Sequence, residues 1–265
     1  MSGVLAEMAT VGLAELVERA ALQSRVDRKY VLPIAEAGRL IEALAPVAAA
    51  LEIDGLRRFR YESTYFDTPD LASYRLTAYR HRRRFKIRTR TYVDSGTTWL
   101  EVKVPGPRGS TMKYRSPHEP GPFLSAGRVF IDDVFARHDF AVQAGFAPTL
   151  RTRYLRVTLL LAPPTDSPGL GSDTVGESRV TIDTGLRFRA DELELRLPAT
   201  AIVETKTGSA ASSADRLLWQ WGHRPVAISK YATGLAALRT DLPAAPWHRV
   251  LRRHFTISME DLAHV

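Results

Sequence analysis

The stretch RHRRRFKIRTRTY, from Arg80 to Tyr92, alternates as a β-strand does and places a cation at nearly every second position. Strand side chains point to opposite faces in turn, so the even-numbered cations share one face: Arg82, Arg84, Lys86, Arg88 and Arg90. Phe85, Ile87 and Thr89 fall on the other face. Because neighbouring cations repel each other, the stretch predicts a strand whose basic face needs an anion among its side chains.

Other segments alternate in the same way, with charged residues on one face and apolar residues on the other. On any single strand, a charged face in contact with water is the more common explanation. A solvated face usually mixes both signs of charge, however, whereas residues 75–90 hold eight Lys or Arg and no acid. We therefore infer that the charged faces line an interior that holds a polyanion. The further alternating segments are 25–29, 98–104, 111–115, 151–157, 178–184 and 201–207.

The order of elements predicts an α+β fold, an antiparallel β-barrel with helices packed outside. Strand patterns separated by turns rich in Gly, Pro, Ser and Asp, without regularly alternating helices, favour antiparallel pairing. Helices would cover the apolar outer faces of the strands. The predicted strands are 24–32, 61–69, 82–93, 98–104, 111–115, 151–161, 178–183, 187–197 and 201–206, and the predicted helices are 4–22, 33–50, 123–138, 213–221, 232–239 and 245–255.

Composition narrows the class of partner. Lys and Arg number 37 against 29 Asp and Glu, a formal net charge of +8, which favours anionic partners. The chain has no cysteine, so disulfide and thiol chemistry are excluded. The first 20 residues do not resemble a signal peptide, and no apolar run reaches the ~20 residues of a membrane span. We expect a soluble, cytoplasmic protein.

Phosphate is the anion that this pattern fits best. Arginine offers a planar fork of donors that matches phosphate oxygens, and lysine adds a point charge. The carboxylate of Glu204, on an alternating strand, suits a divalent metal that bridges phosphate oxygens, or equally a salt bridge to Lys206. The scattered histidines lack ligand spacing, and GPRGS (106–110) lacks the Lys of a phosphate-binding loop, so we interpret it as a turn.

Nine short motifs give the chain a resemblance to a known family, the VTC domains of the triphosphate tunnel metalloenzyme superfamily. The resemblance covers residues 24–240, preceded by an N-terminal helix (1–23) and followed by a basic C-terminal helical tail (241–265). The motifs, in chain order, are RKY (28–30), STYFDT (63–68), KIRTRTY (86–92), LEVKV (100–104), MKYR (112–115), YLR (154–156), RVTIDT (179–184), VETKT (203–207) and SKYATG (229–234).

The resemblance implies an eight-stranded antiparallel tunnel that binds ATP, tripolyphosphate or polyphosphate with a divalent metal, Mn²⁺ or Mg²⁺. It also implies a polyphosphate polymerase-like transfer of the terminal phosphate of ATP. The implied catalytic residues are Lys29, Arg88, Arg90, Lys103, Arg156 and Arg179. The implied substrate-binding residues are Lys113, Arg115, Tyr154, Lys206 and Lys230, with Glu204 as the metal ligand. Asp183 or Glu101 would contribute through water.

Two departures from the family pattern matter. The hydrolase and cyclase branch of the superfamily opens with E-x-E-x-K, where this chain has Arg25, Asp27 and Lys29. This difference favours the VTC branch and argues against a second metal site on the first strand. Some polymerases carry a further basic residue where this chain has Thr233.

Two other functions remain open at this point. They are a metal-dependent tripolyphosphatase, in which water is the acceptor, and a non-catalytic polyphosphate-binding module. A nucleic-acid partner is disfavoured because Glu101 and Glu204 share the basic faces. Any coupling to a membrane would need a separate membrane protein, and the sequence indicates no oligomeric state.

Overall fold

The structure is a computed structural model that describes residues 2–19, 26–106, 111–121, 123–141, 145–163, 177–208, 210–255 and 262–264. The chain divides into two compact units, which are described separately. The first unit contains residues 1–59, 155–186 and 198–226, and the second contains 60–154, 187–197 and 227–265. Two long strands, β8 (Ala147–Leu161) and β9 (Ser178–Ala190), contribute residues to both units.

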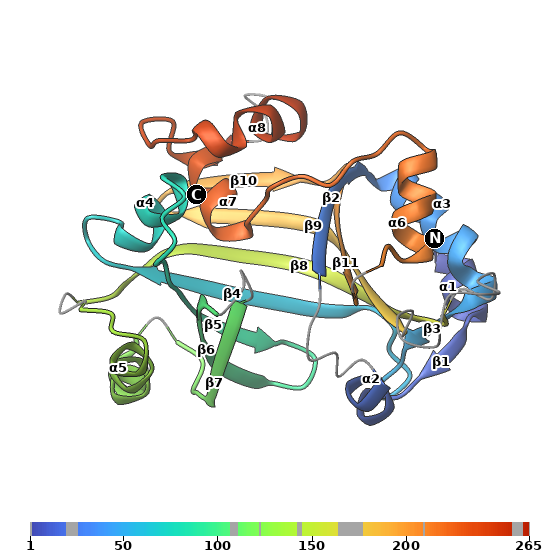
Figure 1. Ribbon diagram of the computed structural model, residues 1–265, viewed down its shortest axis with the longest axis horizontal. Coiled ribbons are helices and arrows are strands. Elements are labelled where there is room, and N and C mark those ends of the chain that lie inside the picture. The colour runs from blue at the N-terminus through green and yellow to red at the C-terminus, as the bar shows by residue number, and fades with distance from the viewer. Residues whose placement is uncertain are drawn as a thin grey trace. The chain divides into compact units, whose positions relative to one another are not determined.

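The first unit is built on antiparallel strands covered by helices (Figure 1). Its elements are α1 (Ser2–Glu7), β1 (Ala9–Val11), α2 (Leu13–Arg19), β2 (Val26–Pro33), α3 (Ile34–Leu44), the 3₁₀ turn η1 (Ala45–Val47), β3 (Ala48–Leu51), β11 (Thr200–Thr207) and α6 (Ser213–Gln220), besides residues of β8 and β9. Strand β11 pairs antiparallel with β2 and with β9, β3 pairs antiparallel with β8, and the short β1 pairs parallel with β3.

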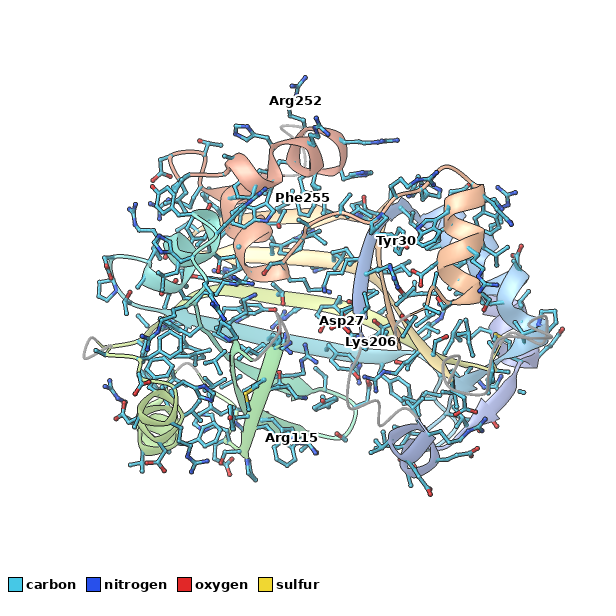
Figure 2. The ribbon with its side chains drawn as sticks, viewed as in Figure 1. Asp27, Tyr30, Arg115, Lys206, Arg252 and Phe255 are labelled. Atoms are coloured by element: carbon cyan, nitrogen blue, oxygen red, sulfur yellow. The ribbon has the colours of Figure 1, made fainter. Side chains whose placement is uncertain are left out.

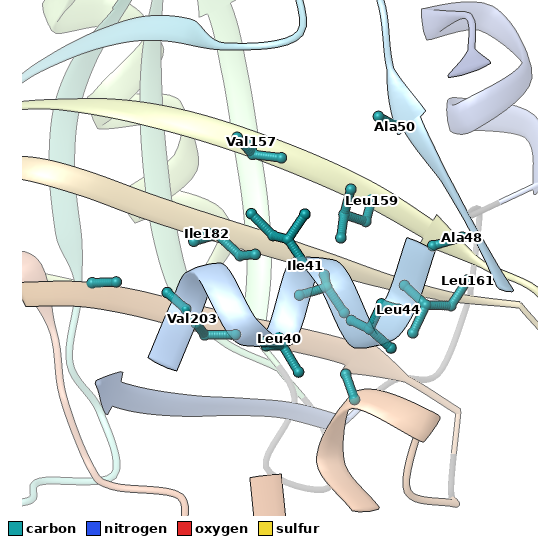
Figure 3. Close-up of a cluster of buried hydrophobic side chains, with 14 of the residues drawn as sticks. Leu40, Ile41, Leu44, Ala48, Ala50, Val157, Leu159, Leu161, Ile182 and Val203 are labelled. Atoms are coloured by element: carbon teal, nitrogen blue, oxygen red, sulfur yellow. The ribbon is translucent and has the colours of Figure 1, made fainter. Parts of the chain in front are cut away.

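The core of this unit lies between α3 and the strands (Figure 3). Leu40, Ile41 and Leu44 recur on one face of α3 and are fully buried. They belong to the same cluster as Ile182 of β9 and Val203 of β11. Because strand side chains alternate, packing Val203 inward turns its neighbours Ile202 and Glu204 to the opposite face.

Helix α6 is fixed to the strands by the buried carboxylate of Asp215. Ser212 and Asp215 form a capping box at the start of the helix. Asp215 also accepts hydrogen bonds from the hydroxyls of Tyr30 on β2 and Thr205 on β11, each at 2.7 Å. Burial and the Asp215 carboxylate together raise the pKa of Tyr30, so this hydroxyl remains a donor. One side chain thus joins a helix to two strands.

Two helices predicted from sequence are shorter than expected. The predicted helix over 4–22 is interrupted by β1, because Thr10 and Val11 pair with β3 and Gly12 separates this strand from α2. The predicted helix over 33–50 ends at Leu44. Pro46 introduces the turn η1, and the alanines that follow pair as β3.

The second unit contains the antiparallel strands β4, β5, β6 and β7 in that order. No helix among the described residues is long and apolar enough to span a membrane. The elements are β4 (Phe59–Asp67), α4 (Ala72–Ala78), β5 (Lys86–Tyr92), β6 (Thr97–Pro105), β7 (Thr111–Pro117), η3 (Ser125–Gly127), α5 (Arg128–Arg137), β10 (Leu193–Leu197), α7 (Lys230–Leu238), η4 (Ala245–Trp247), α8 (His248–His254) and β12 (Leu262–His264).

The apolar face of β5 and β6 is covered by α5. Phe85, Ile87 and Val102 are buried in one cluster with Ile131 and Phe135 of this helix. The prediction that helices cover the apolar faces of the strands therefore holds in this unit. The basic face of the same strands points the other way.

The basic strand is shorter than the sequence predicts, so the placement of two of its arginines was wrong. Strand β5 begins at Lys86, and residues 81–85 have no strand geometry. Arg80 has a φ of +57°, which turns the chain sharply just before this segment. Arg82 and Arg84 are therefore exposed loop residues and do not belong to the basic strand face.

The predicted α+β class with mainly antiparallel strands is confirmed. Eight strands pair in the order β2, β11, β9, β8, β4, β5, β6, β7, and β10 pairs with β9 and β12 outside this series. The sheet does not close on itself among the described residues. Its last strand, β7, carries mostly exposed side chains including Lys113 and Arg115, and charged residues of this kind protect an open sheet edge.

Candidate phosphate-binding site

Three lysines lie in a row across three neighbouring strands of the second unit. Lys86 of β5 is the direct cross-strand partner of Lys103 of β6, and Lys103 is also the partner of Lys113 of β7. Side chains directly opposite each other on antiparallel strands are close neighbours, and like charges in these positions destabilise a sheet. This row therefore costs stability unless an anion neutralises it.

The next row along the same face is Arg88, Glu101 and Arg115. Arg88 donates from Nε to Oε2 of Glu101 at 2.7 Å, and Lys113 Nζ lies 3.6 Å from Oε1 of the same carboxylate. Burial opposes ionisation of Glu101, but Arg88, Arg90 and Lys113 outweigh it and hold its pKa below the usual value. This carboxylate is therefore ionised and positions the surrounding cations.

Arg90 and Arg115 complete the basic face. Arg115 stacks over the ring of Trp99 at 4.7 Å, and Arg90 lies 5.5 Å from the ring of Tyr61. The Nε of Arg90 is buried and has no hydrogen-bond partner within the described ranges. Buried donors are nearly always paired, so this atom marks a position where a ligand acceptor would bind. Across β5, β6 and β7, six cations share this face with one carboxylate, Glu101.

The start of α7 belongs to the same unit and contacts this face. Ser229 caps the helix, and its Oγ accepts a hydrogen bond from Lys86 Nζ at 2.8 Å. The next residue, Lys230, places its ammonium 4.7 Å from the centre of the Tyr154 ring. Tyr231 then donates to the buried carboxylate of Asp67 on β4, which fastens the helix to this strand.

The first unit carries a second charged face, on β2, β9 and β11. Glu204 of β11 lies directly opposite Lys29 of β2, and its Oε1 is 3.6 Å from Lys29 Nζ and 2.9 Å from Lys206 Nζ. Lys206 lies opposite Asp27, and both side chains are labelled side by side in Figure 2. Lys206 is also the partner of Arg179 on β9.

Arg156 of β8 is held in the same unit by Asp183 of β9. Two parallel hydrogen bonds join them, from Nε at 2.6 Å and from Nη2 at 2.8 Å. This bidentate pairing fixes the plane of the guanidinium. Asp183 therefore has a role similar to that of Glu101 in the other unit, since each carboxylate orients an arginine.

Lysine pKa values reflect the excess of cations on both faces. Burial lowers the pKa of Lys103 most, and repulsion from Arg88, Arg90 and Lys86 lowers it further, so it lies well below the usual value. Burial likewise lowers the pKa of Lys206 to about 8, although Glu204 acts in the opposite direction. These side chains bear a positive charge at a cost that an anionic ligand would remove.

The chemistry of Glu204 fits the divalent metal that the family resemblance implies. Burial opposes its ionisation, but Lys206 and Lys29 outweigh this effect and hold its pKa well below the usual value. Magnesium is commonly held by one or two carboxylates together with substrate phosphates. Within the described residues, no group of three His, Cys, Asp or Glu could hold a metal without such a substrate. Glu204 therefore fits as a single protein ligand that acts together with phosphate oxygens.

The structure gathers the residues predicted from sequence into two sets, one in each unit. Lys29, Arg156, Arg179, Glu204 and Lys206 belong to the first unit, and Arg88, Arg90, Lys103, Lys113, Arg115, Tyr154 and Lys230 belong to the second. Their individual roles stay predictions. The sequence-based site list missed Lys86 and Ser229, although Lys86 alternates in phase with Arg88 and Arg90. Arg25 and most of the turn GPRGS (106–110) lie outside the described residues.

Comparisons with known proteins place the chain in a family. The model of the VTC domain family matches residues 24–239, which is most of the sequence. The chain belongs to the VTC domain family. No curated protein matches the sequence.

Several solved structures are similar at low sequence identity. One is a protein proposed to be an adenylate cyclase from Bacillus halodurans (12% identity, 78% of this chain, 94% of that chain, TM-score 0.45). Another is a proposed adenylyl cyclase from Hippeastrum described as having a dominant triphosphatase activity (14% identity, 83% and 98% coverage, TM-score 0.43). A third is the PH1012 protein from Pyrococcus horikoshii (12% identity, 90% and 94% coverage, TM-score 0.37). At these scores the likeness carries no argument about function.

Proposed function

We propose that the protein binds the phosphate chain of ATP or of polyphosphate and transfers the terminal phosphate with the help of a divalent metal. The observation that carries the proposal is the row of Lys86, Lys103 and Lys113, three cations opposite one another on adjacent strands. A linear phosphate chain carries charge densely enough to neutralise several of them at once. Membership of the VTC domain family supports the same ligand class.

In this proposal the protein contributes charge and position and supplies no nucleophile. A terminal oxygen of phosphate or of a short polyphosphate attacks the γ-phosphorus of ATP, the bond to the β-phosphate oxygen breaks, and ADP leaves. Each unit supplies an arginine that a carboxylate holds in a fixed orientation for binding phosphate oxygens, Arg88 held by Glu101 in the second unit and Arg156 held by Asp183 in the first. A divalent ion, when bound at Glu204, supplies Lewis-acid stabilisation of the charge on the transferred phosphate.

The direct test is incubation of the purified protein with ATP and Mn²⁺ or Mg²⁺, followed by separation of the phosphate products. Long chains and ADP are expected. The Glu204→Gln variant keeps the shape of the side chain and should lose metal-dependent turnover while remaining folded. Glu119→Gln, at an exposed position of the second unit, is the matched control. Turnover by Glu204→Gln at the wild-type rate would contradict the metal assignment.

The same assay separates the polymerase from the two other functions. Orthophosphate without long chains would identify a metal-dependent tripolyphosphatase, in which water replaces the phosphate acceptor. Tight binding of tripolyphosphate without any turnover would identify a non-catalytic polyphosphate-binding module. Each outcome leaves the phosphate-binding role of the basic faces intact.

A further inference from the structure

A second group of arginines lies elsewhere in the second unit, on a surface formed by β4, β8, β9 and β10. Two adjoining pockets there, of about 260 and 60 Å³, share Arg151 and Arg189 in their linings. The smaller pocket is lined by four arginines and a single acid: Arg151, Arg153, Arg187, Arg189 and Glu194. None of these arginines belongs to the residues that the family resemblance implies.

These pockets lie on the opposite face of β4 from the candidate site. Ser63 and Tyr65 are the cross-strand partners of Arg90 and Arg88, so they belong to the basic face described above. Thr64, between them, lines the larger pocket. Because neighbouring strand residues point to opposite faces, the pocket and the lysine row lie on different sides of the strand.

Alternation along β8 agrees with this assignment. Arg151 and Arg153 are exposed, and the residues between and after them, Thr152 and Tyr154, are buried. Tyr154 is the residue whose ring contacts Lys230 in the candidate site. The two arginines therefore point away from that site.

Strand β9 supplies the other two arginines beyond a bend. Gly185 has a φ of +60°, a conformation typical of a bulge, and it separates Asp183 from the arginine segment. Leu186 and Phe188 are then buried, and Arg187, between them, is exposed. Arg187 and Arg189 thus line the smaller pocket together, and Arg189 also lines the larger one.

Cations outnumber acids in this group. One carboxylate, Glu62, serves both Arg151 (3.5 Å) and Arg153 (2.9 Å). Glu194 is already paired with Arg196, and the Nε of Arg189 donates to the backbone oxygen of Asp191 at 3.3 Å. The guanidinium groups of Arg187 and Arg189 thus have further N–H groups that can donate hydrogen bonds to an anion.

We propose that these pockets form a second binding site for a linear polyphosphate chain longer than a triphosphate. Guanidinium groups spread over two adjoining pockets match an extended polyanion. Thr64, Thr149 and Asp191 also line the larger pocket. The choice of polyphosphate among polyanions rests on the proposed function. A chain that binds at both sites would be held more tightly than tripolyphosphate, because the second contact is intramolecular.

The test compares the binding of long-chain polyphosphate and of tripolyphosphate in the presence of EDTA, which prevents metal-dependent turnover. The double variant Arg187→Gln/Arg189→Gln should lower the affinity for long-chain polyphosphate roughly tenfold or more and leave the affinity for tripolyphosphate unchanged. The charge-matched control is Arg249→Gln/Arg253→Gln on α8, where both side chains are exposed. Unchanged long-chain affinity in the first variant, or an equal loss in the control, would overturn the proposal.

Two further arms exclude other sources of negative charge. Single-stranded DNA of equal charge and vesicles of phosphatidylglycerol should not depend on Arg187 and Arg189 for binding. An equal dependence in either arm would show that the surface recognises charge alone and would overturn the proposal. In the wild-type protein, long-chain polyphosphate should also protect these arginines from phenylglyoxal, and absence of protection would contradict the proposal without requiring a variant.

Failure of this inference is distinguishable from failure of the proposed function. Turnover that survives in Glu204→Gln contradicts the metal assignment but does not concern the arginines of β9. Unchanged long-chain binding in Arg187→Gln/Arg189→Gln removes the second site and leaves turnover untouched.

Discussion

Arg88 and Glu101 are direct cross-strand partners, and the Nε of Arg88 donates to Oε2 of Glu101 at 2.7 Å. Glu101 is only 1% exposed and is the one carboxylate among the cations of β5, β6 and β7. Its charge therefore stabilises the fold, because both Arg88 and Lys113 would lose this shared counter-charge without it.

We predict that Glu101→Gln lowers the free energy of unfolding by about 3 kcal/mol at pH 7, measured by urea denaturation. Added tripolyphosphate should restore part of this loss because it supplies the missing negative charge. The exposed Glu119→Gln serves as a control with an expected change within about 0.5 kcal/mol. Equal stability of Glu101→Gln and wild type would show that the carboxylate does not hold the cations together.

The pair of Arg88 and Glu101 also predicts how the free energy of unfolding depends on pH. The neighbouring cations outweigh burial and lower the pKa of Glu101 in the folded state from its ordinary value of 4.5. A lowered carboxyl pKa stabilises the fold above the unfolded value and loses this effect as pH falls through the folded value. The stability difference between wild type and Glu101→Gln should therefore shrink when urea denaturation is repeated at successively lower pH below 4.5.

Lys103 should show a trade-off between stability and binding. Replacing this partly buried lysine with Met removes a cation that Lys86, Arg88 and Arg90 repel. We predict that Lys103→Met raises the free energy of unfolding of the ligand-free protein by about 1 kcal/mol and weakens tripolyphosphate binding at least tenfold. Denaturation and calorimetric titration measure the two effects. A variant that is both less stable and equally good at binding would contradict the charge-repulsion argument.

Lys103 also has a lowered pKa, but here the charged form of the side chain destabilises the fold, whereas the charged form of Glu101 stabilises it. Burial and neighbouring cations lower the pKa of Lys103 below 10.5. Below the folded pKa the lysine is charged in both states and the full cost of burying its charge is present. As pH rises toward 10.5 the folded protein carries a neutral lysine and this cost disappears. The stability advantage of Lys103→Met should therefore decrease with rising pH in denaturation experiments.

Asp215 should be essential for the stability of the first unit. Asp215→Ala leaves the hydroxyls of Tyr30 and Thr205 without their acceptor and removes the capping box of α6, so we expect a loss of about 3 kcal/mol. Urea denaturation followed by tryptophan fluorescence is suitable, because the indole of Trp219 donates to the Tyr30 hydroxyl. Asp132→Ala, which removes only an exposed ion pair with Arg128, should change stability by less than about 1 kcal/mol. Similar losses in both variants would contradict the role of Asp215.

Alternation of side chains was enough to predict the apolar and basic faces of the strands. Ile87 and Val102 are buried beneath α5, and Arg88 and Lys103 lie on the other face, because a two-residue period is a local property of the chain. The identity of several candidate residues followed from this period and from the short motifs.

Strand register and strand ends were not predictable in the same way. The alignment of Lys86 with Lys103 and Lys113 depends on the register of two strand pairs, β5 with β6 and β6 with β7. The sequence of a single strand does not determine this register. The prediction placed Arg82 on the strand, but β5 begins only at Lys86, after the chain turns at Arg80 with a positive φ. The alternation of residue types does not reveal this backbone conformation. The hydrogen bond between Tyr30 and Asp215 joins residues far apart in sequence, which no local pattern predicts.

We expect the lysine row described above to favour long anions over short ones. A chloride ion can neutralise only one ammonium group, so several such ions would have to be immobilised separately along the row. One phosphate chain neutralises the same groups while losing its translational freedom only once. We therefore expect a preference for longer anions, because one long anion loses translational freedom once, whereas several small ions lose it several times. Such discrimination between chain lengths needs no contact that recognises a chain end.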